Sequence, residues 1–526
     1  MNEILILDCT LRDGGYINNW NFGKKAIRDI IFNLERSGLD IIERGFLQDK
    51  PYNSDIALFN NVDQIAQLIT PKKQGVLYVA MIALGDIEPE KIKPYDGTSI
   101  DGIRLTFHKE DWKPAKIAAE ILIDKGYKVF VQPVGTTTYS DTEFLSLIEE
   151  VNKLHPYAFY LVDTLGKLYR NDLLRLFFMV ENNLLPDICV GLHSHNNLQL
   201  SFSNAQELLR INVKRPIILD TSVFGMGRGA GNLPTELLAK FMNENIAPKY
   251  QVTPLLTIVD RYLNAIYART PWGYSAPYFL ASTSDCHPNY ATYLMNKETL
   301  GVEDISKILN DIPEEHRGLY HEDLVERLYL EFQNHKVDDN NVYRQLSIEL
   351  RGRTALLLAP GRSIQTCNKE IQDYIKKNQP VVFSVNFVPQ NIPTDFLFIS
   401  NLKRLEMLSP VQNEDIKIIV TSNLKDHLVG DYLCVDYANL LGEGREADNA
   451  GAMLIRMLEK CKVKLISLAG FDGFHSGAED NYYINNLQRR LDSLEVQQKN
   501  EDIGRQLRQA SLHLNLNFIT ETKYLL

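Results

Sequence analysis

Eight short apolar stretches follow one another along the first part of the chain, and this repeat constrains the fold more than any other feature. They are centred near residues 5, 41, 79, 104, 131, 160, 190 and 218. Segments with helical apolar spacing separate most of them, as where Ile27, Ile30, Ile31 and Leu34 recur. A spacing of roughly 25–35 residues is typical of parallel βα units. We therefore expect a (β/α)8 TIM barrel over residues 1–250; an open doubly wound sheet is second, because no G-x-G-x-x-G follows the first strand.

Polar side chains stand just past the predicted strands, where a barrel of this kind gathers its loops at one mouth. His193 and His195 lie two apart at the end of a strand and should project from the same face. Asp13 follows the first strand, in front of a glycine pair. Two imidazoles and a carboxylate suit a divalent cation of intermediate hardness. The residues therefore predict a metal site. The polar residues expected at the mouth are Asp8, Arg12, Asp13, Glu43, Arg104, His108, Gln132, Asp163, Thr164, His193, His195 and Asp220.

Three ordered segments resemble the signatures of the TIM-barrel aldolases and acyl-transferring synthases. They are D-C-T-L-R-D-G-G at 8–15, G-L-H-S-H-N-N at 191–197 and G-M-G-R-G-A-G-N at 225–232. That superfamily includes the 4-hydroxy-2-oxovalerate aldolases, which the third segment resembles most, the 3-hydroxy-3-methylglutaryl-CoA lyases and the isopropylmalate synthases. The resemblance covers roughly residues 1–325. It implies a divalent cation, Mn²⁺ or Mg²⁺, and adds Asn232 as a metal ligand or a residue that orients one; an ordinary turn residue is the alternative.

The expected chemistry is cleavage or formation of a 4-hydroxy-2-oxo acid, with a pyruvate enolate and an aldehyde as partners. Arg12 is placed to donate to the developing oxyanion, a role that the resemblance also implies. The related aldolases carry a histidine shortly after R-D-G, whereas this chain has Tyr16. The general base is therefore open among Tyr16, Glu43, His108 and a metal-bound water.

Four of the mouth residues are predicted to bind substrate, namely Arg104, Gln132, Asp163 and Thr164. Each also has a structural alternative. Asp163 could cap the following helix, and Glu43 could pair with Arg12 or Arg104. Two alternatives to the aldolase reaction also stay open. One is a Claisen-type synthase or lyase that uses an acyl-CoA, and the other is a non-catalytic protein that binds a glycan precursor.

Two regions follow the predicted barrel. Residues 251–340 should form a helical extension; in related aldolases such helices partly cover the barrel mouth, so Tyr274, His287 or Tyr290 could reach the site. After the polar stretch 336–341, a strand–helix pattern restarts and predicts a separate Rossmann-like domain over residues 341–526.

The turn that follows the first strand of the second domain suits a phosphate, because its backbone N–H groups and Arg362 could bind one. Several segments there are faintly similar to the nucleotide-sugar-binding domains of bacterial sialyltransferases. That likeness implies a nucleotide sugar or sugar phosphate near Gly361, Arg362, Ser363, Asn386 and Asp472. The pairing of the two domains suggests surface-polysaccharide or glycoconjugate biosynthesis.

The composition limits the classes of partner that the protein is expected to bind. With 56 basic and 67 acidic residues the net charge is −11, which argues against nucleic acid or an anionic membrane as the main partner. No apolar run approaches the ~20 residues of a membrane span. A strand begins almost at the N-terminus, and the six cysteines are scattered without a C-x-x-C pair. We expect a cytoplasmic protein with reduced, buried cysteines, and a homodimer is a weaker expectation.

Overall fold

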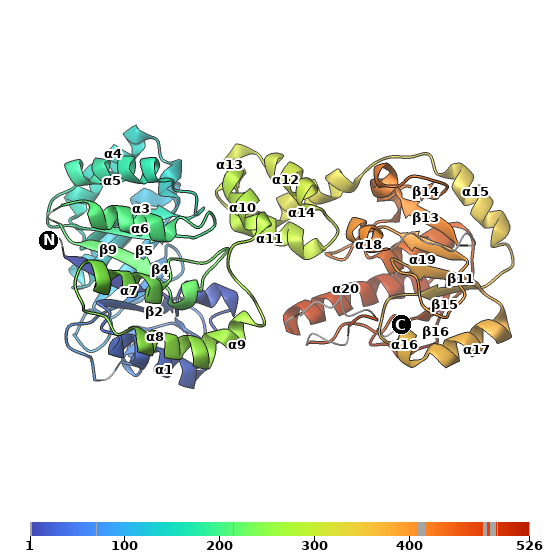
Figure 1. Cartoon of the computed structure of the whole chain (residues 1–526), viewed down its shortest axis with the longest axis horizontal. Coiled ribbons are helices and arrows are strands. Elements are labelled where there is room, and N and C mark those ends of the chain that lie inside the picture. The colour runs from blue at the N-terminus through green and yellow to red at the C-terminus, as the bar shows by residue number, and fades with distance from the viewer. Residues whose placement is uncertain are drawn as a thin grey trace. The chain divides into compact units, whose positions relative to one another are not determined.

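The computed structural model describes residues 3–69, 71–213, 215–408, 416–476, 481–483, 491 and 493–524. The chain forms two compact units, described in turn here (Figure 1). The first contains Met1–Thr292 and Ile312–His321, and the second contains Tyr293–Asp311 and Glu322–Leu526. None of the helices in these described ranges combines the length and the hydropathy that a bilayer-spanning segment requires.

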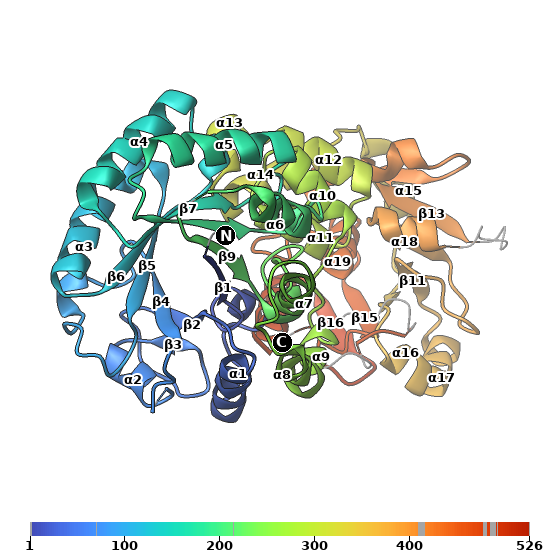
Figure 2. The same ribbon diagram turned by 60° about the vertical axis from the view of Figure 1, so that its left-hand side comes forward.

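The first unit is a closed barrel of eight parallel strands, as the sequence predicts (Figure 2). Hydrogen bonds run from each strand to the next around the ring, and β1 closes it by pairing with both β9 and β2. A two-residue strand, β3 (Leu58–Phe59), adds to the end of β2. The barrel strands are β1 (Ile4–Asp8), β2 (Ile41–Leu47), β4 (Leu77–Ala83), β5 (Gly102–Phe107), β6 (Lys128–Pro133), β7 (Ala158–Asp163), β8 (Cys189–Ser194) and β9 (Ile217–Thr221).

Helices surround the ring of strands and bury one apolar stripe each against it. The sequence predicts most of them. In the described chain no α-helix separates β4 from β5; there is only a short turn, Pro89–Lys91, in a segment that also contains Pro94 and Gly97 and is poorly suited to a helix. The helices are α1 (Lys24–Arg36), α2 (Val62–Ala66), α3 (Trp112–Asp124), α4 (Asp141–Leu154), α5 (Arg170–Asn183), α6 (Ser201–Arg210), α7 (Thr235–Asn245) and α8 (Val252–Ile258).

Two apolar layers hold the barrel together. The larger one lies between strands and helices. The smaller one fills the interior of the ring with side chains that include Leu7, Val79, Phe130 and Ile218. Because the interior is packed with apolar groups at one end, the polar strand-end residues are confined to the other end, at the carboxyl ends of the strands.

The helices after the barrel are divided between the two units. In the first unit, the Ser282 hydroxyl donates to the Leu165 carbonyl at 2.6 Å and the Trp272 indole donates to the Phe224 carbonyl at 3.0 Å. Both carbonyls follow barrel strands, so this part of the extension rests on loops of the mouth. The helices are α9 (Asn264–Tyr267), α10 (Ala276–Thr283), α11 (Pro288–Lys297), α12 (Val302–Asn310), α13 (Glu314–Arg317), α14 (Glu322–Gln333) and α15 (Asn340–Glu349).

The polar stretch 336–341, predicted as a linker, is bonded into the second unit. The Val337 N–H donates to Asp436 at 3.1 Å, and the Asp436 N–H donates to Asp339 at 2.9 Å. Upstream, the Tyr329 hydroxyl of α14 donates to Asp448. The second unit therefore begins before residue 341, because buried polar contacts attach α14 and its successor to the sheet.

The second unit is built on a parallel sheet of seven strands, which confirms the predicted second α/β domain. The strand order is β14-β13-β12-β11-β10-β15-β16. The sequence prediction lacks β14, which has only three residues, and β16, in which polar and apolar residues alternate. The strands are β10 (Ala355–Leu358), β11 (Val381–Val385), β12 (Phe396–Ile399), β13 (Lys417–Thr421), β14 (Leu433–Val435), β15 (Leu465–Ala469) and β16 (Asn515–Phe518). The helices are α16 (Ser363–Thr366), α17 (Asn368–Asn378), α18 (Leu402–Met407), α19 (Ala450–Lys460) and α20 (Ser493–Ser511).

All six cysteines are free thiols. Four are buried, whereas Cys367 and Cys434 are half-buried. The prediction of reduced cysteines agrees with this arrangement, and the prediction of burial holds for four of the six.

Candidate active site

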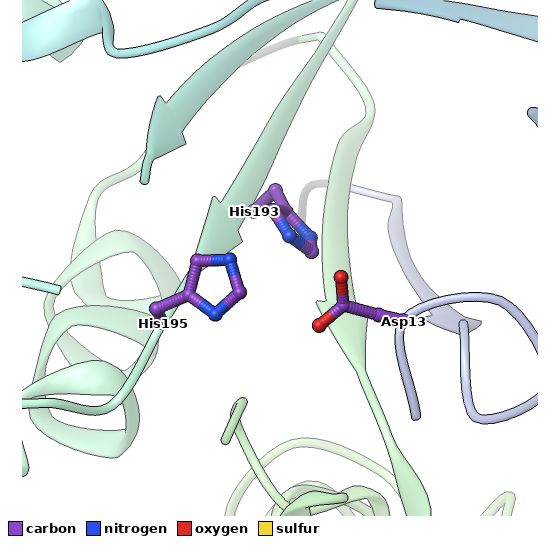
Figure 3. Close-up of side chains that lie close together, drawn as sticks. All are labelled: Asp13, His193 and His195. Atoms are coloured by element: carbon purple, nitrogen blue, oxygen red, sulfur yellow. The ribbon is translucent and has the colours of Figure 1, made fainter. Parts of the chain in front are cut away.

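Asp13, His193 and His195 come together at the barrel mouth, as the sequence predicts (Figure 3). One ligand atom from each side chain lies within 4.8 Å of the others, and all three residues are buried. The Asp13 carboxylate points toward both imidazole rings. The two histidines take part because they are two residues apart where β8 ends, and Asp13 takes part because the turn after β1 brings it back over the ring.

A chain of buried ionic contacts holds His193 in place. The Asp220 carboxylate, at the end of β9, lies 2.9 Å from His193 Nδ1. Asp220 also pairs with Arg104 and accepts from the Tyr160 hydroxyl at 3.1 Å. Arg104 in turn donates to Glu43 at 2.6 Å. With Nδ1 engaged by a carboxylate, the other ring nitrogen of His193 is left to face the cluster, an arrangement typical of metal-ligating histidines.

Arg12 is fixed between two carboxylates. Its Nε donates to Glu43 at 2.8 Å and its Nη1 donates to Asp13 at 2.6 Å. The third nitrogen, Nη2, is buried and has no hydrogen-bond partner in the described part of the chain. A buried, fully charged donor without a partner is costly unless a ligand supplies one. Arg12 therefore has the geometry expected of a group that donates to a substrate oxyanion.

The residues present fit a divalent cation. Asn232 donates through Nδ2 to Asp13, whereas its Oδ1 is buried and has no partner among the described residues. The same holds for His195 Nδ1. A Cβ on Gly227 would lie 2.4 Å from the Asn232 amide and 2.8 Å from the Asp13 carboxylate. Carboxylate, imidazole and amide atoms thus surround a space that a side chain at residue 227 would fill.

The electrostatics of the site keep Asp13 and His195 in the forms that bind a cation. Burial opposes ionisation of Asp13, but Arg12 and then the two histidines hold its pKa well below the usual range. Burial lowers the pKa of His195 to about 3, so the imidazole is neutral. Asp220 is also buried, yet Arg104 and His193 keep its pKa below the ordinary value. Neutral imidazoles and ionised carboxylates are the metal-binding forms.

Tyr16 stands where related aldolases carry a histidine. Its ring packs against Trp20, with centroids 4.7 Å apart, and the Arg228 guanidinium lies 4.8 Å from the ring centroid. The Trp20 indole donates to the Arg12 carbonyl at 2.7 Å, which ties this aromatic group to the site. Withdrawal of the hydroxyl from water raises the pKa of Tyr16, and Arg228 only partly offsets the effect. Tyr16 therefore keeps its proton at neutral pH.

The predicted substrate-binding residues differ in what they contact. With its oxygen turned toward Arg104, the Gln132 amide accepts from that side chain at 2.6 Å, deep in the barrel. Both carboxylate oxygens of Asp163 accept backbone N–H groups of its own loop at 3.0 Å. The Thr164 hydroxyl accepts from the Gly135 N–H at 2.9 Å. These contacts shape the loops of the mouth, and His108 is exposed at the end of β5.

Two basic side chains lie near the site: Arg228, to which the sequence assigned no role, and His287, one of the three residues after the barrel that were expected to reach it. Arg228, in the third signature, acts electrostatically on Asp13, His195 and Tyr16. His287 is 7% exposed and accepts from the Asn289 N–H through Nδ1. Burial lowers the pKa of His287 well below its usual value, and Arg228 and His195 add to the effect. The arginine within a glycine-rich signature was a usable signal, whereas His287 reaches the mouth only through tertiary folding.

The predicted phosphate turn of the second unit already holds a carboxylate of the chain. Asp472, after β15, accepts from the Ser363 N–H at 2.8 Å and from the Ser363 hydroxyl. The Gly361 N–H donates to the Gly470 carbonyl at 3.1 Å. Asn386, after β11, accepts from the Ser400 N–H at 3.0 Å. Arg362 is exposed. Both turn N–H groups are thus engaged within the chain.

Comparison with known proteins agrees with this geometry. Residues 3–260 match the family model described as HMGL-like. 4-Hydroxy-2-oxovalerate aldolase 6 of Rhodococcus jostii is 25% identical over 275 residues, which cover 50% of this chain and 75% of the relative. The oxaloacetate decarboxylase of Mycobacterium tuberculosis is 25% identical over 244 residues, which cover 45% of this chain and 69% of the relative.

Among solved structures, the N-terminal domain of a candidate aldolase from Bacteroides vulgatus superposes with a TM-score of 0.50 at 24% identity. The match covers 58% of this chain and 99% of that one, and it supports the barrel fold. The three signatures and the family match lead to a separate conclusion. Residues 3–260 belong to the HMGL-like family, and their barrel is that of a carbon–carbon lyase.

Proposed function

We propose that the barrel is a divalent-metal-dependent aldolase that cleaves or forms a 4-hydroxy-2-oxo acid. Pyruvate and an aldehyde are the products of cleavage and the substrates of the reverse condensation. One observation carries the proposal. The buried Asp13, His193 and His195 cluster adjoins an Arg12 nitrogen that has no partner in the described chain. Ligands for a cation and a donor for an oxyanion are the two elements that cleavage next to a 2-oxo group requires.

The chain's own residues orient the reaction. A divalent cation, when bound, would supply Lewis-acid charge that stabilises an enolate oxygen. Arg12 is held by Glu43 and Asp13, so its Nη2 can donate to the same oxygen without rearrangement. Asp220 keeps His193 in one tautomer and one orientation. The Trp20 indole donates to the Arg12 carbonyl and so fixes the backbone beside this guanidinium.

Tyr16 is the residue we assign to the proton on the aldehyde oxygen. Because its pKa is raised, the hydroxyl can give a proton to the alkoxide that forms on condensation. In the cleavage direction the same oxygen must take the proton back. Arg228 next to the ring favours the tyrosinate that this step needs. Glu43 Oε1, buried and without a partner in the described chain, is the remaining carboxylate acceptor nearby.

Product analysis tests the reaction class. Purified full-length protein is incubated with Mn²⁺ or Mg²⁺ and a panel of 4-hydroxy-2-oxo acids, and pyruvate and aldehyde are both measured. We expect equal amounts of the two products from at least one member and none from His193→Ala. If pyruvate never appears, while a 2-oxo acid and an acyl-CoA are consumed together, the barrel is a Claisen-type enzyme and the proposal is wrong.

A second candidate reaction is decarboxylation of a 2-oxo diacid, favoured by the likeness to the oxaloacetate decarboxylase. The same buried site would stabilise the same enolate, with carbon dioxide leaving in place of an aldehyde. No alkoxide forms in that case, so Tyr16 would have no proton to transfer. Release of carbon dioxide from oxaloacetate that survives Tyr16→Phe would identify this reaction.

The finer expectations from the sequence remain predictions. They are the choice between Mn²⁺ and Mg²⁺, a homodimer, a cytoplasmic location, a nucleotide sugar or sugar phosphate as ligand of the second domain, and a place in surface-polysaccharide biosynthesis. The last rests only on the pairing of an aldolase-like barrel with a second α/β domain. Loss of a surface glycan on deletion of the gene is the result that it predicts.

A further inference from the structure

The second unit contains a cavity of about 370 Å³ at the carboxyl ends of its parallel strands. Its walls include the segments that follow β10, β11, β12 and β15. In the sheet, β10 and β15 are neighbours, although more than a hundred residues separate them. The strands β11 to β14 extend the sheet from β10 in one direction, and β16 extends it from β15 in the other. Open parallel sheets bind ligands in the crevice at such a reversal of strand order.

The floor of this crevice is closed by backbone. A Cβ on Gly470 would lie 2.0 Å from the Ala359 carbonyl oxygen, and one on Gly361 would lie 2.2 Å from the Gly470 oxygen. The Asp472 carboxylate accepts from the N–H and the hydroxyl of Ser363, and the Gly361 N–H donates to the Gly470 carbonyl. A ligand in the cavity must therefore be recognised by side chains on its walls. A volume of this size suits a single small molecule.

In the described part of the wall, four side chains are basic, and three of them are paired with carboxylates. Lys297 pairs with Glu326 at 2.9 Å, Arg445 with Glu322 at 2.6 Å and Lys499 with Glu446 at 2.5 Å. The fourth basic side chain is that of Arg404. Within each pair the two charges neutralise each other. The pairs therefore make the wall more rigid but add little affinity for an anion.

Arg404 differs from the other three. Within the described residues its guanidinium has neither an ion pair nor a hydrogen bond, and it lies over the Tyr482 ring at 5.4 Å from the centroid. It is half-buried, on α18, a helix whose first turn Asn401 caps. A guanidinium held against an aromatic face, with its donors unused, is suited to one carboxylate or phosphate group.

The rest of the wall favours hydroxyl groups over further negative charge. Among the wall residues that the structure describes, seven side chains are acidic and four are basic. This excess of acidic groups acts on Glu326: burial, and then the charges of Asp448 and Glu446, raise its pKa to about 7. Carboxylates accept hydrogen bonds from hydroxyls but repel additional anionic groups. The aromatic side chains Tyr293, Phe474 and Tyr524 supply flat apolar faces between them.

We propose that this cavity binds a polyhydroxylated small molecule with a single anionic group, which Arg404 holds while wall carboxylates accept from the hydroxyls. A sugar acid and a sugar phosphate both have this chemistry, and they differ only in the anion. The proposal concerns the second unit alone and does not depend on the reaction of the barrel. A diphosphate ligand is disfavoured, because the acidic wall would face its second charge.

Calorimetric titration of the full chain tests the proposal with probes that share a carbon skeleton. Gluconate carries the carboxylate, glucose 6-phosphate carries the phosphate and glucose carries no anion; acetate and inorganic phosphate carry the anions alone. We expect gluconate or glucose 6-phosphate to bind, and whichever binds tighter identifies the anion. Glucose and the bare anions should bind at least about tenfold more weakly, because each lacks one half of the contacts.

Variants locate the binding in this cavity. Arg404→Gln should weaken it by about tenfold or more, and Arg404→Lys by less, since one charged donor remains. Arg351→Gln, at an exposed arginine outside the cavity wall, is the matched control and should bind as the wild type does. Thermal unfolding of each variant checks that the fold is kept. His193→Ala should also bind as the wild type does, which separates this site from the barrel mouth.

Three results would overturn the proposal. They are no binding of any probe to the wild-type chain, equal binding by wild type and a folded Arg404→Gln variant, and binding of UDP-glucose more than about tenfold tighter than that of either singly anionic probe. The last would mean that the site is built for a diphosphate, against the charge of its wall.

Discussion

Both parallel sheets of this chain end in polar side chains, but the two ends satisfy those side chains differently. At the barrel mouth, buried polar atoms without a partner in the described chain gather around one point: Arg12 Nη2, Glu43 Oε1, His195 Nδ1 and Asn232 Oδ1. At the crevice of the second sheet, the turn that looked suited to phosphate is filled by Asp472, and Arg404 is the wall cation left without a partner in the described ranges.

The two sheet ends show that a sequence motif does not by itself identify a binding site. In the barrel, sequence signatures and unsatisfied atoms coincide, because a bound cation and an oxyanion would complete the network. In the second sheet, a glycine-containing turn after a strand indicates a tight connection, and its donors serve the fold. The informative signal there is Arg404, a charged group without an ion-pair partner among the described residues.

The largest effect that we expect concerns Arg12. Arg12→Lys keeps the charge but loses the planar fork that Glu43 and Asp13 hold. We expect kcat for pyruvate release to fall by on the order of 10³-fold, while metal binding is kept. Steady-state kinetics with metal analysis of the same sample is the measurement. Arg28→Gln, at an exposed arginine of α1, should have wild-type kinetics. Wild-type kcat in Arg12→Lys would remove Arg12 from the mechanism.

Tyr16→Phe should cost less, on the order of 10²-fold in kcat, because the ring packing survives and only the proton route is lost. Metal binding should not change. The matched control is Tyr52→Phe, at a tyrosine that is 37% exposed and stacks on Phe59. An unchanged pH–rate profile together with wild-type turnover would assign the proton transfer elsewhere, Glu43 being the next group to replace.

Asp220→Asn tests the support of the barrel site without replacing one of its predicted metal ligands. The amide can still bond to Arg104 or to Tyr160, but it no longer presents a charged acceptor to His193. We expect metal affinity to fall by about 10- to 100-fold, measured by competition with a chelating dye. The surface pair of His155 with Asp187, at 2.8 Å, provides the control. If the Asp187→Asn and Asp220→Asn variants bind metal equally well, the Asp220 carboxylate does not support the metal site.

The smallest effect belongs to the second sheet. Asp472→Ala should lower the free energy of unfolding of this unit by about 1–2 kcal/mol, since the Ser363 N–H and hydroxyl lose their acceptor. Urea denaturation followed by circular dichroism measures it, with Asp373→Ala on the exposed side of α17 as the control. Barrel turnover should not change. A fully stable Asp472→Ala variant would show that the turn does not need its carboxylate.

The barrel and its ligand triad were accessible from sequence for physical reasons. Strand and helix periods are local, and a strand fixes that His193 and His195 share a face. The contacts that tune the site are not local. The sequence predicts Asp220 at the mouth, but its contact with His193 depends on the pairing of the neighbouring strands β8 and β9. Likewise, a turn that looks suited to phosphate could not be told from one filled by Asp472, more than a hundred residues away.

Metal binding is the measurement that tests the central claim most directly. Metal-stripped full-length protein is titrated with Mn²⁺ and with Mg²⁺, beside Asp13→Ala, His193→Ala and, as control, the exposed-site variant His155→Ala. The account predicts one ion per chain in the wild type and in His155→Ala, and loss of that ion in the other two variants. A wild-type chain that binds neither cation, or an Asp13→Ala variant that binds them equally well, would contradict it.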